Sequence, residues 1–280
     1  MNKEIIEFGK RMDRAEDKAL LVEYAEGATQ VLDLGAGTGK ISRDIAEKYG
    51  AHCDAVDIQF KDNCQNSDNV TYYGMSIANF LKTYKDKKYD CIILSAIIHE
   101  LDALTLDFLK EYLPTMMKKN CRILIREPFY ERGLGPIKAE DTDIFIDLVS
   151  KSISANKALK YYFATKLSLG GSMFNHQIPF SSAIDYANLA FVVSYGEQSW
   201  EREKHEFRYA YSLDWCKDFF NFTDKRFASS IARPFTGFQV YPVLDSSYKD
   251  HFIEAGIPGK AFDLLQYTGM IIVIDYSKGD

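Results

Sequence analysis

Short apolar runs alternate with helical patterns along the first half of the chain. Five runs of four to seven residues predict β-strands, because each is rich in apolar side chains and bounded by turn residues. Between them, apolar residues recur at the spacing of one helix face, which predicts helices. This alternation predicts a parallel sheet with helices on both faces. The expected strands are 30–34, 53–58, 70–73, 89–95 and 122–126, and the expected helices are 14–26, 39–49, the segment around 77–81, and 104–113, which Pro114 should end or kink.

The alternation stops after about residue 130 and resumes near the end of the chain. Candidate helices at 141–166, 182–194 and 199–220 indicate a mostly helical stretch, and 247–255 predicts one more helix. Two final apolar runs, 261–267 and 270–275, predict a strand pair. We therefore expect an α/β fold with a doubly wound, mostly parallel sheet. Residues 1–129 and 241–280 should form its core, and 130–240 a helical insertion that caps the substrate.

Composition narrows the choice of partner. The formal net charge is -6, and no run of five or more Lys and Arg residues occurs, so a small molecule is favoured over nucleic acid.

The chain has five cysteines, none in a CxxC pair, and no His/Cys cluster with zinc-site spacing, so we expect neither a disulfide framework nor a metal. It has no signal-like N-terminus and no apolar stretch of membrane-spanning length, which makes a cytoplasmic location the expectation.

The loop after the first predicted strand carries the strongest chemical signal. Residues 33–39 read DLGAGTG, with three glycines at every second position between a strand and a helix. Glycines let the backbone turn sharply and approach a ligand closely, and the start of the following helix presents free N–H groups to it. A dinucleotide-binding loop would need a glycine at position 40, where Lys40 stands.

The pattern DxGxGxG at the end of a first strand resembles the first motif of the class I methyltransferases. The resemblance covers roughly 14–128 and 245–275, and it implies S-adenosylmethionine as the cofactor, with its methionine part wrapped by Gly35–Gly39. Asp57 ends the second strand, where the family resemblance assigns an acidic residue to the ribose hydroxyls. At the end of the third strand, Met75 stands where family members often carry the Asp that meets the adenine. The expected cofactor-binding residues are Asp33, Gly35, Ala36, Gly37, Gly39, Asp57, Ile58, Met75, Ser76, Ile77 and Ser95.

Candidate catalytic residues follow the fourth and fifth strands, because ligands of open α/β sheets bind beyond the carboxyl ends of the strands. His99 lies in a segment, 89–101, that resembles the family's fourth-strand motif, and its side chain can act as a base near neutral pH. Its alternative is a packing role at a helix start. Glu127 could accept a proton or bind an amine, and Arg126 could bind a carboxylate or phosphate. Equally, the two could pair with each other at the mouth of the insertion.

These features predict methyl transfer from S-adenosylmethionine to an O or N atom of an acceptor, with a small molecule favoured. Two alternatives stay open. One is an RNA methyltransferase. The other is a non-catalytic protein of the same fold that binds a partner through residues 130–240.

Overall fold

The structure is a computed structural model of the 280-residue chain, and it describes residues 17–59, 68–131, 135–155, 183–194, 209–223 and 233–277. Contacts between residues divide the chain into two compact units. The sheet unit holds the described residues up to Pro128, Leu213–Val243, and the chain from Gly269 onward. The helical unit holds the described residues of Phe129–Ser212 and of Leu244–Thr268.

The sheet unit contains one seven-stranded sheet in the order β3-β2-β1-β4-β5-β7-β6. Strands β1 to β5 run parallel, whereas β7 is antiparallel to both β5 and β6. This topology confirms the doubly wound, mostly parallel fold expected from the sequence. The strands are β1 (Gln30–Leu34), β2 (His52–Val56), β3 (Val70–Tyr73), β4 (Tyr89–Ser95), β5 (Met117–Glu127), β6 (Gly237–Val243) and β7 (Gly269–Tyr276).

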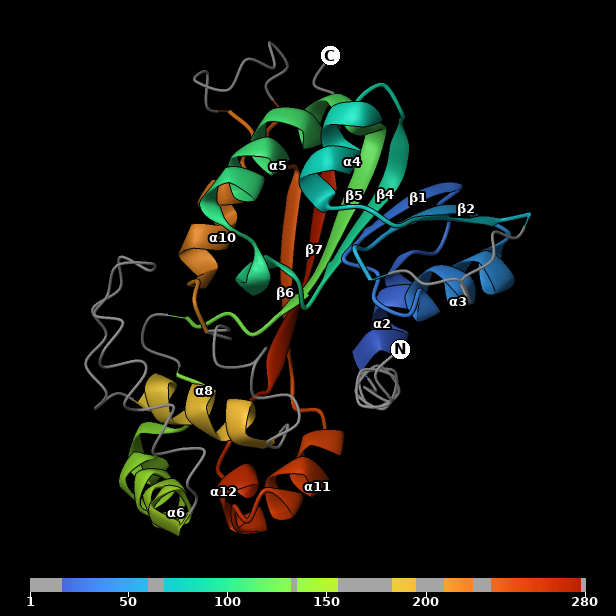
Figure 1. Ribbon diagram of the computed structural model, residues 1–280. Helices are drawn as coiled ribbons and strands as arrows, with labels where there is room; N and C mark the ends of the chain where they lie inside the picture. Colours follow the sequence, from blue (N-terminus) through green and yellow to red (C-terminus); the bar gives the residue numbers. More distant parts are fainter. Residues whose placement is uncertain are drawn as a thin grey trace. The chain divides into compact units, whose positions relative to one another are not determined.

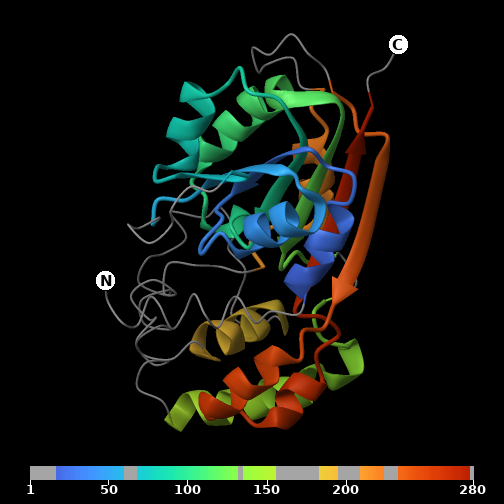
Figure 2. The same cartoon turned by 90° about the vertical axis from the view of Figure 1, so that its right-hand side faces the viewer.

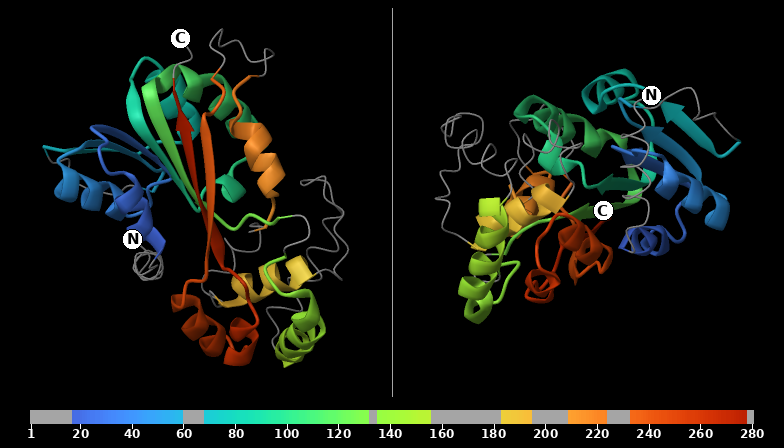
Figure 3. Two further views of the ribbon diagram at one scale, coloured as in Figure 1. Left: turned by 180° about the vertical axis from the view of Figure 1, so that it is seen from behind. Right: turned by 60° about the horizontal axis from the view of Figure 1, so that its bottom comes forward.

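Helices cover both faces of this sheet (Figures 1 and 3). Helices α2 and α3 pack together on one face, and α4 and α5 pack together on the other. Both faces of the central strands are therefore buried, which is why β1 and β4 read as continuous apolar runs. The described helices of this unit are α2 (Asp17–Tyr24), α3 (Lys40–Tyr49), α4 (Ile77–Thr83), α5 (Ala103–Met116) and α10 (Leu213–Phe220), with a short 3-10 turn η1 (Ile98–Glu100). Helix α5 continues two residues beyond Pro114, so the proline precedes its end without setting it.

The described part of the helical unit contains four helices that pack against one another (Figure 2). Aromatic side chains fill its core: the ring of Phe191 lies 5.2 Å from that of Tyr248 and 5.5 Å from that of Phe252. The helices are α6 (Thr142–Ala155), α8 (Ala183–Ser194), α11 (Ser247–Glu254) and α12 (Gly259–Asp263), with a 3-10 turn η2 (Ala139–Asp141). The expected helical segments 156–166 and 199–208 lie outside the described residues.

The predicted strand at 261–267 is wrong. Residues 259–263 form α12, and the strand that pairs with β7 is β6. A short apolar run does not by itself distinguish a strand from a buried helix, and here Ala261, Phe262 and Leu265 share the spacing of a helix face. Strand β6 was not predicted because it contains Pro242, which a sheet tolerates at an edge strand such as this one.

The boundaries of the two units also differ from those expected. Helix α10 and the first four residues of β6 fall within the expected insertion 130–240, but they belong to the sheet unit. Helix α11 was placed in the core, but it belongs to the helical unit. The chain therefore passes from one unit to the other several times. Among the described residues, no helix is both long enough and apolar enough to cross a membrane.

Candidate active site

The glycine loop between β1 and α3 is shaped by two close contacts and one open position. All three glycines have positive φ, at 76° for Gly35, 58° for Gly37 and 73° for Gly39. A Cβ atom on Gly35 would lie 2.5 Å from Cγ1 of Ile97, and one on Gly39 would lie 2.5 Å from a ring carbon of Tyr72. A Cβ on Gly37 would meet nothing within 4 Å. The loop is thus pressed against its neighbours at both ends and has free space at its middle glycine.

Asp57 lies directly beside this loop. Its carboxylate accepts hydrogen bonds from the backbone N–H of Gly37 at 2.9 Å and of Gln59 at 2.7 Å. Burial raises the pKa of Asp57, although these two hydrogen bonds oppose the rise. Each carboxylate oxygen can accept more than one hydrogen bond, so the group can still receive two hydroxyls. The next side chain, Ile58, is 69% exposed, an unusual position for a large apolar residue beside a binding loop.

Two other predicted residues have polar atoms enclosed within the unit. Asp33 is fully buried and accepts a hydrogen bond from Ser42 Oγ at 2.7 Å, whereas its Oδ1 has no hydrogen-bond partner among the described residues. Ser95 ends β4, and its buried Oγ likewise has no partner in the described part of the chain. The next residue, Ala96, has a φ of 53°. Positive φ in a non-glycine residue is strained, and such strain clusters at functional sites.

The turn after β3 holds the three residues expected at the adenine. Met75 is half-buried at this turn. The hydroxyl of Ser76 caps α4 by accepting from the N–H of Asn79 at 3.2 Å, and Ile77 is 7% exposed. The Ser76 hydroxyl therefore caps α4 and the Ile77 side chain is buried, whereas Met75, like Ser76, is only half-buried.

His99 and Glu127 come together at the carboxyl ends of β4 and β5. His99 Nδ1 lies 2.7 Å from Glu127 Oε2, and both side chains are 2% exposed. The other oxygen, Oε1, accepts from the backbone N–H of Ile97 at 2.6 Å and from that of Ile98. Glu127 therefore binds the β4 loop and the imidazole at once. Since Ile97 also touches Gly35, the dyad and the glycine loop belong to one contiguous region of the sheet unit.

Comparison with known proteins agrees with this arrangement. A family model described as a methyltransferase domain matches residues 32–124, from β1 to the middle of β5. The match covers about a third of the chain and confirms the methyltransferase domain expected from the sequence. The family assignment makes S-adenosylmethionine the cofactor of this domain.

One curated relative and two solved structures illustrate the family's range. Pluviatolide O-methyltransferase of Sinopodophyllum hexandrum is 26% identical over 129 residues, which is 44% of this chain and 33% of the relative. An O-methyltransferase family protein of Burkholderia thailandensis superposes with a TM-score of 0.50 at 10% identity, over 99% of this chain and 60% of that one. Human N-acetylserotonin methyltransferase, solved with S-adenosylmethionine, gives a TM-score of 0.50 at 10% identity, over 98% of this chain and 56% of that one. The chain thus spans about a third of the length of this curated relative, and the two solved structures share the chain's fold.

The methyltransferase region fits its cofactor at several independent points. The open space at Gly37 leaves room for a ligand beside the loop, and the Asp57 carboxylate has lone pairs left that two ribose hydroxyls could use. Exposed Ile58 could offer an apolar surface to the adenine ring, and the Ser95 hydroxyl, which has no hydrogen-bond partner among the described residues, is a polar atom that a ligand or its water could satisfy. No group of His, Cys, Asp or Glu among the described residues could hold a metal ion.

Arg126, the third candidate for catalysis, lies apart from His99 and Glu127. Its Nε is 2.6 Å from Asp17 Oδ1 in α2, and both side chains are buried. Successive residues of a strand point to opposite faces of the sheet, so Arg126 faces α2 while Glu127 turns toward the β4 loop. Its position indicates that Arg126 anchors α2 rather than contacting an acceptor. Nothing in the sequence identified Asp17 as its partner.

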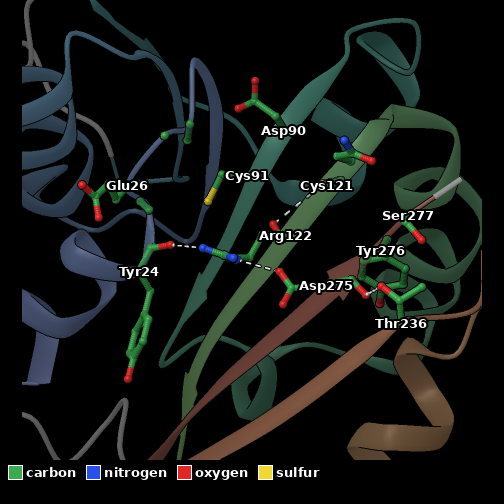
Figure 4. A pocket seen from close by; sticks show the side chains of 14 residues that line it. Tyr24, Glu26, Asp90, Cys91, Cys121, Arg122, Thr236, Asp275, Tyr276 and Ser277 are labelled. Atoms are coloured by element: carbon green, nitrogen blue, oxygen red, sulfur yellow. Dashed lines mark hydrogen bonds and ion pairs between the residues drawn. The ribbon is translucent and has the colours of Figure 1, made fainter.

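A cavity of about 350 Å³ in the same unit lies elsewhere (Figure 4). It lies at the opposite ends of the strands from the glycine loop, where β1 and β4 begin and β7 ends. The Arg122 guanidinium there pairs with Asp275 at 2.8 Å and with the Tyr24 carbonyl at 2.9 Å, and Asp90 accepts from Lys118 at 2.9 Å. None of the expected site residues lines this cavity, and its charged groups hold strands together.

Proposed function

We propose that this methyltransferase transfers a methyl group from S-adenosylmethionine to a hydroxyl oxygen of a small organic acceptor, with His99 as the general base. The observation that carries the proposal is the buried His99–Glu127 pair, with its 2.7 Å contact beside the glycine loop. The other expected cofactor contacts are part of the same proposal, with Asp57 at the ribose and Gly35–Gly39 around the methionine part.

Glu127 fixes which nitrogen of His99 can accept a proton. A carboxylate only accepts hydrogen bonds, so the imidazole nitrogen 2.7 Å away, Nδ1, must carry the hydrogen. The lone pair of the neutral ring then resides on Nε2. Because both side chains are buried, few water molecules compete for these contacts, and the tautomer is held in place.

S-Adenosylmethionine supplies an electrophilic methyl group bound to a positively charged sulfur. A hydroxyl oxygen attacks poorly until its proton is removed, and a positioned base contributes about 10²–10⁴-fold to such a step. In the proposed reaction His99 Nε2 takes the hydroxyl proton while the oxygen forms its bond to the methyl carbon. The carbon–sulfur bond breaks, and its electron pair stays on sulfur. Glu127 stabilises the resulting imidazolium, which later releases its proton to solvent.

A hydroxyl acceptor is favoured over an amine for two reasons. A neutral amine already has a free lone pair and needs no base, so a fixed imidazole–carboxylate pair would add little. In addition, the curated relative is named as an O-methyltransferase. The net charge of -6 disfavours RNA as the acceptor, and an RNA substrate would reveal itself by steep weakening of binding with salt. We also propose the helical unit as the part that selects the acceptor.

The proposal is tested by measuring S-adenosylhomocysteine formation with panels of phenols, aliphatic alcohols, amines and RNA. We expect turnover with hydroxyl acceptors and a loss of at least about 100-fold in His99→Gln. His52→Gln is the matched control, because His52 is an exposed residue at the opposite end of β2 and should leave turnover unchanged. Turnover confined to amines or RNA, or an unaffected His99→Gln variant, would refute the assignment. Cofactor binding without turnover on any panel would favour the non-catalytic alternative.

A further inference from the structure

Asp33 is a buried carboxyl group whose two oxygens are unequally hydrogen-bonded. It is 0% exposed, it lies in β1 two residues before Gly35, and its side chain accepts a hydrogen bond from Ser42 Oγ at 2.7 Å. Its second oxygen, Oδ1, has no hydrogen-bond partner among the described residues. An ionised carboxylate in such surroundings is costly, so it tends either to hold a proton or to be balanced by a nearby positive charge.

The groups around Asp33 do not fully offset the cost of a negative charge on its carboxylate. Helix α3 provides the neutral Ser42, and Lys18 of α2 acts on it only as a more distant charge. On the β2 side, Asp57 opposes its ionisation, and Cys53 is a buried thiol. Burial is the largest effect, and together these influences raise the pKa of Asp33 to about 6. The carboxyl therefore changes charge within a mildly acidic range, unlike an ordinary aspartate.

We propose that Asp33 is a proton-linked counter-charge for the cofactor: it holds a proton in the free protein at mildly acidic pH and releases it to solvent when the cationic methionine part binds at the Gly35–Gly39 loop. The inference rests on the cofactor assignment within the proposed function, but it concerns binding and not methyl transfer. Since Asp33 is fully enclosed, it acts through space and does not touch the ligand, and its role is that of a positioning charge.

The physical basis is the weak screening of charges inside a protein. A positive group bound at the loop favours the ionised form of Asp33 far more than it would across water. By reciprocity, the ionised carboxyl strengthens binding of that positive group. The methionine part of S-adenosylmethionine carries two cations, the ammonium and the sulfonium, whereas S-adenosylhomocysteine retains only the ammonium. Neither ligand changes its own charge between about pH 5 and pH 7.

The experiment is calorimetric titration of the full chain with each ligand, without acceptor, at about pH 5, 6 and 7. With S-adenosylmethionine we expect binding to weaken by about tenfold from pH 7 to pH 5, because a group with a pKa of about 6 is only about a tenth ionised at pH 5. Heats measured in two buffers of different ionisation enthalpy should show a proton released on binding near pH 5. If binding of S-adenosylhomocysteine depends equally on pH, the ammonium is the cation that interacts with Asp33. A smaller pH dependence would identify the sulfonium instead.

Three variants test whether Asp33 is responsible. Asp33→Asn should bind with little change between pH 5 and pH 7. Ser42→Ala removes the hydrogen bond that favours ionisation, so the midpoint of the pH dependence should move upward, and this small change keeps the test available if Asp33→Asn does not fold. His99→Gln should retain the wild-type dependence, which separates Asp33 from titration of the histidine.

The outcomes distinguish this inference from the proposed function. Binding that is equally tight at all three pH values, or a dependence unchanged in Asp33→Asn or in Ser42→Ala, overturns the role of Asp33 alone. Failure of the wild-type protein to bind either ligand overturns both claims. A proton-linked binding reaction in a protein that methylates no hydroxyl acceptor supports the role of Asp33 and overturns only the proposed function.

Discussion

Replacing Gly35 by alanine perturbs the contact that joins the glycine loop to the β4 loop. Two costs can be worked from the structure. The φ of 76° places an alanine in the left-handed region, which costs roughly 1–2 kcal/mol. The new Cβ would also lie 2.5 Å from Cγ1, 2.8 Å from Cβ and 2.8 Å from Cδ1 of Ile97. Because Ile97 Cβ cannot rotate away, the overlap adds about 1–3 kcal/mol. We expect Gly35→Ala to lower the free energy of unfolding by about 2–5 kcal/mol.

Gly37→Ala is the matched control, since its φ is 58° and its Cβ would meet nothing within 4 Å. It should lose only the backbone cost of about 1–2 kcal/mol. Urea denaturation of the wild type and both variants measures the difference. A double-mutant cycle with Ile97→Ala should recover part of the overlap cost of about 1–3 kcal/mol in Gly35→Ala, because it removes Cγ1 and Cδ1 while Cβ remains. Equal destabilisation by Gly35→Ala and Gly37→Ala, or no coupling to Ile97, would refute the close approach of the two loops.

Three further predictions concern other parts of the sheet unit. Glu127→Gln should let the histidine adopt the other tautomer, because the amide can donate to Nδ1; nitrogen NMR of His99 reads the tautomer, and an unchanged spectrum would contradict the role of Glu127. Burial alone would raise the pKa of Asp90, but hydrogen bonds from the start of β1 and from β5 lower it below its usual value. The ionised Asp90 carboxylate therefore stabilises the fold at neutral pH, and this stabilisation is lost as the pH falls through the lowered pKa. In acid denaturation, Asp90→Asn should lose less stability than the wild type below about pH 4. Ala96→Gly should leave the unfolding free energy unchanged or raise it by up to ~1 kcal/mol, since it relieves a φ of 53°. The control Ala19→Gly, at an exposed position of α2, should lower the unfolding free energy by about 1 kcal/mol. Equal losses in the two variants would argue against strain at position 96.

The sequence predicted the parts of the fold that follow from local periodicity. Strands β1, β3 and β4 have the expected bounds; for β1 and β4 the reason is that a parallel strand buried on both faces is a largely apolar run. The run 261–267 was ambiguous because apolar content over a few residues, without a longer period, does not separate a short helix from a strand. Strand β6 gave little signal because it is an edge strand, only partly buried and interrupted by Pro242.

The candidate site was predictable to the extent that it depends on position along a strand. His99 and Glu127 were placed near each other because both follow neighbouring parallel strands, and the structure brings them to 2.7 Å. Arg126 was grouped with them for the same reason, although the alternation of side chains along β5 could have separated it from Glu127. The close contact of Gly35 with Ile97 and the buried bond from Ser42 to Asp33 depend on packing between distant segments, which no local pattern encodes.

The most direct test of the central claim, a cofactor site at the glycine loop and Asp57, is calorimetric titration with S-adenosylhomocysteine. The comparison is between the wild type, Asp57→Asn, and Asp68→Asn as a control, since Asp68 is an exposed aspartate in a turn. Hydrogen bonds to a charged group contribute about 1.5–3 kcal/mol each, so the loss of ribose contacts should weaken binding by at least about tenfold. We predict micromolar binding by the wild type and the control and weaker binding by folded Asp57→Asn. Failure of the folded wild type to bind, or equal affinity in all three proteins, would contradict the account.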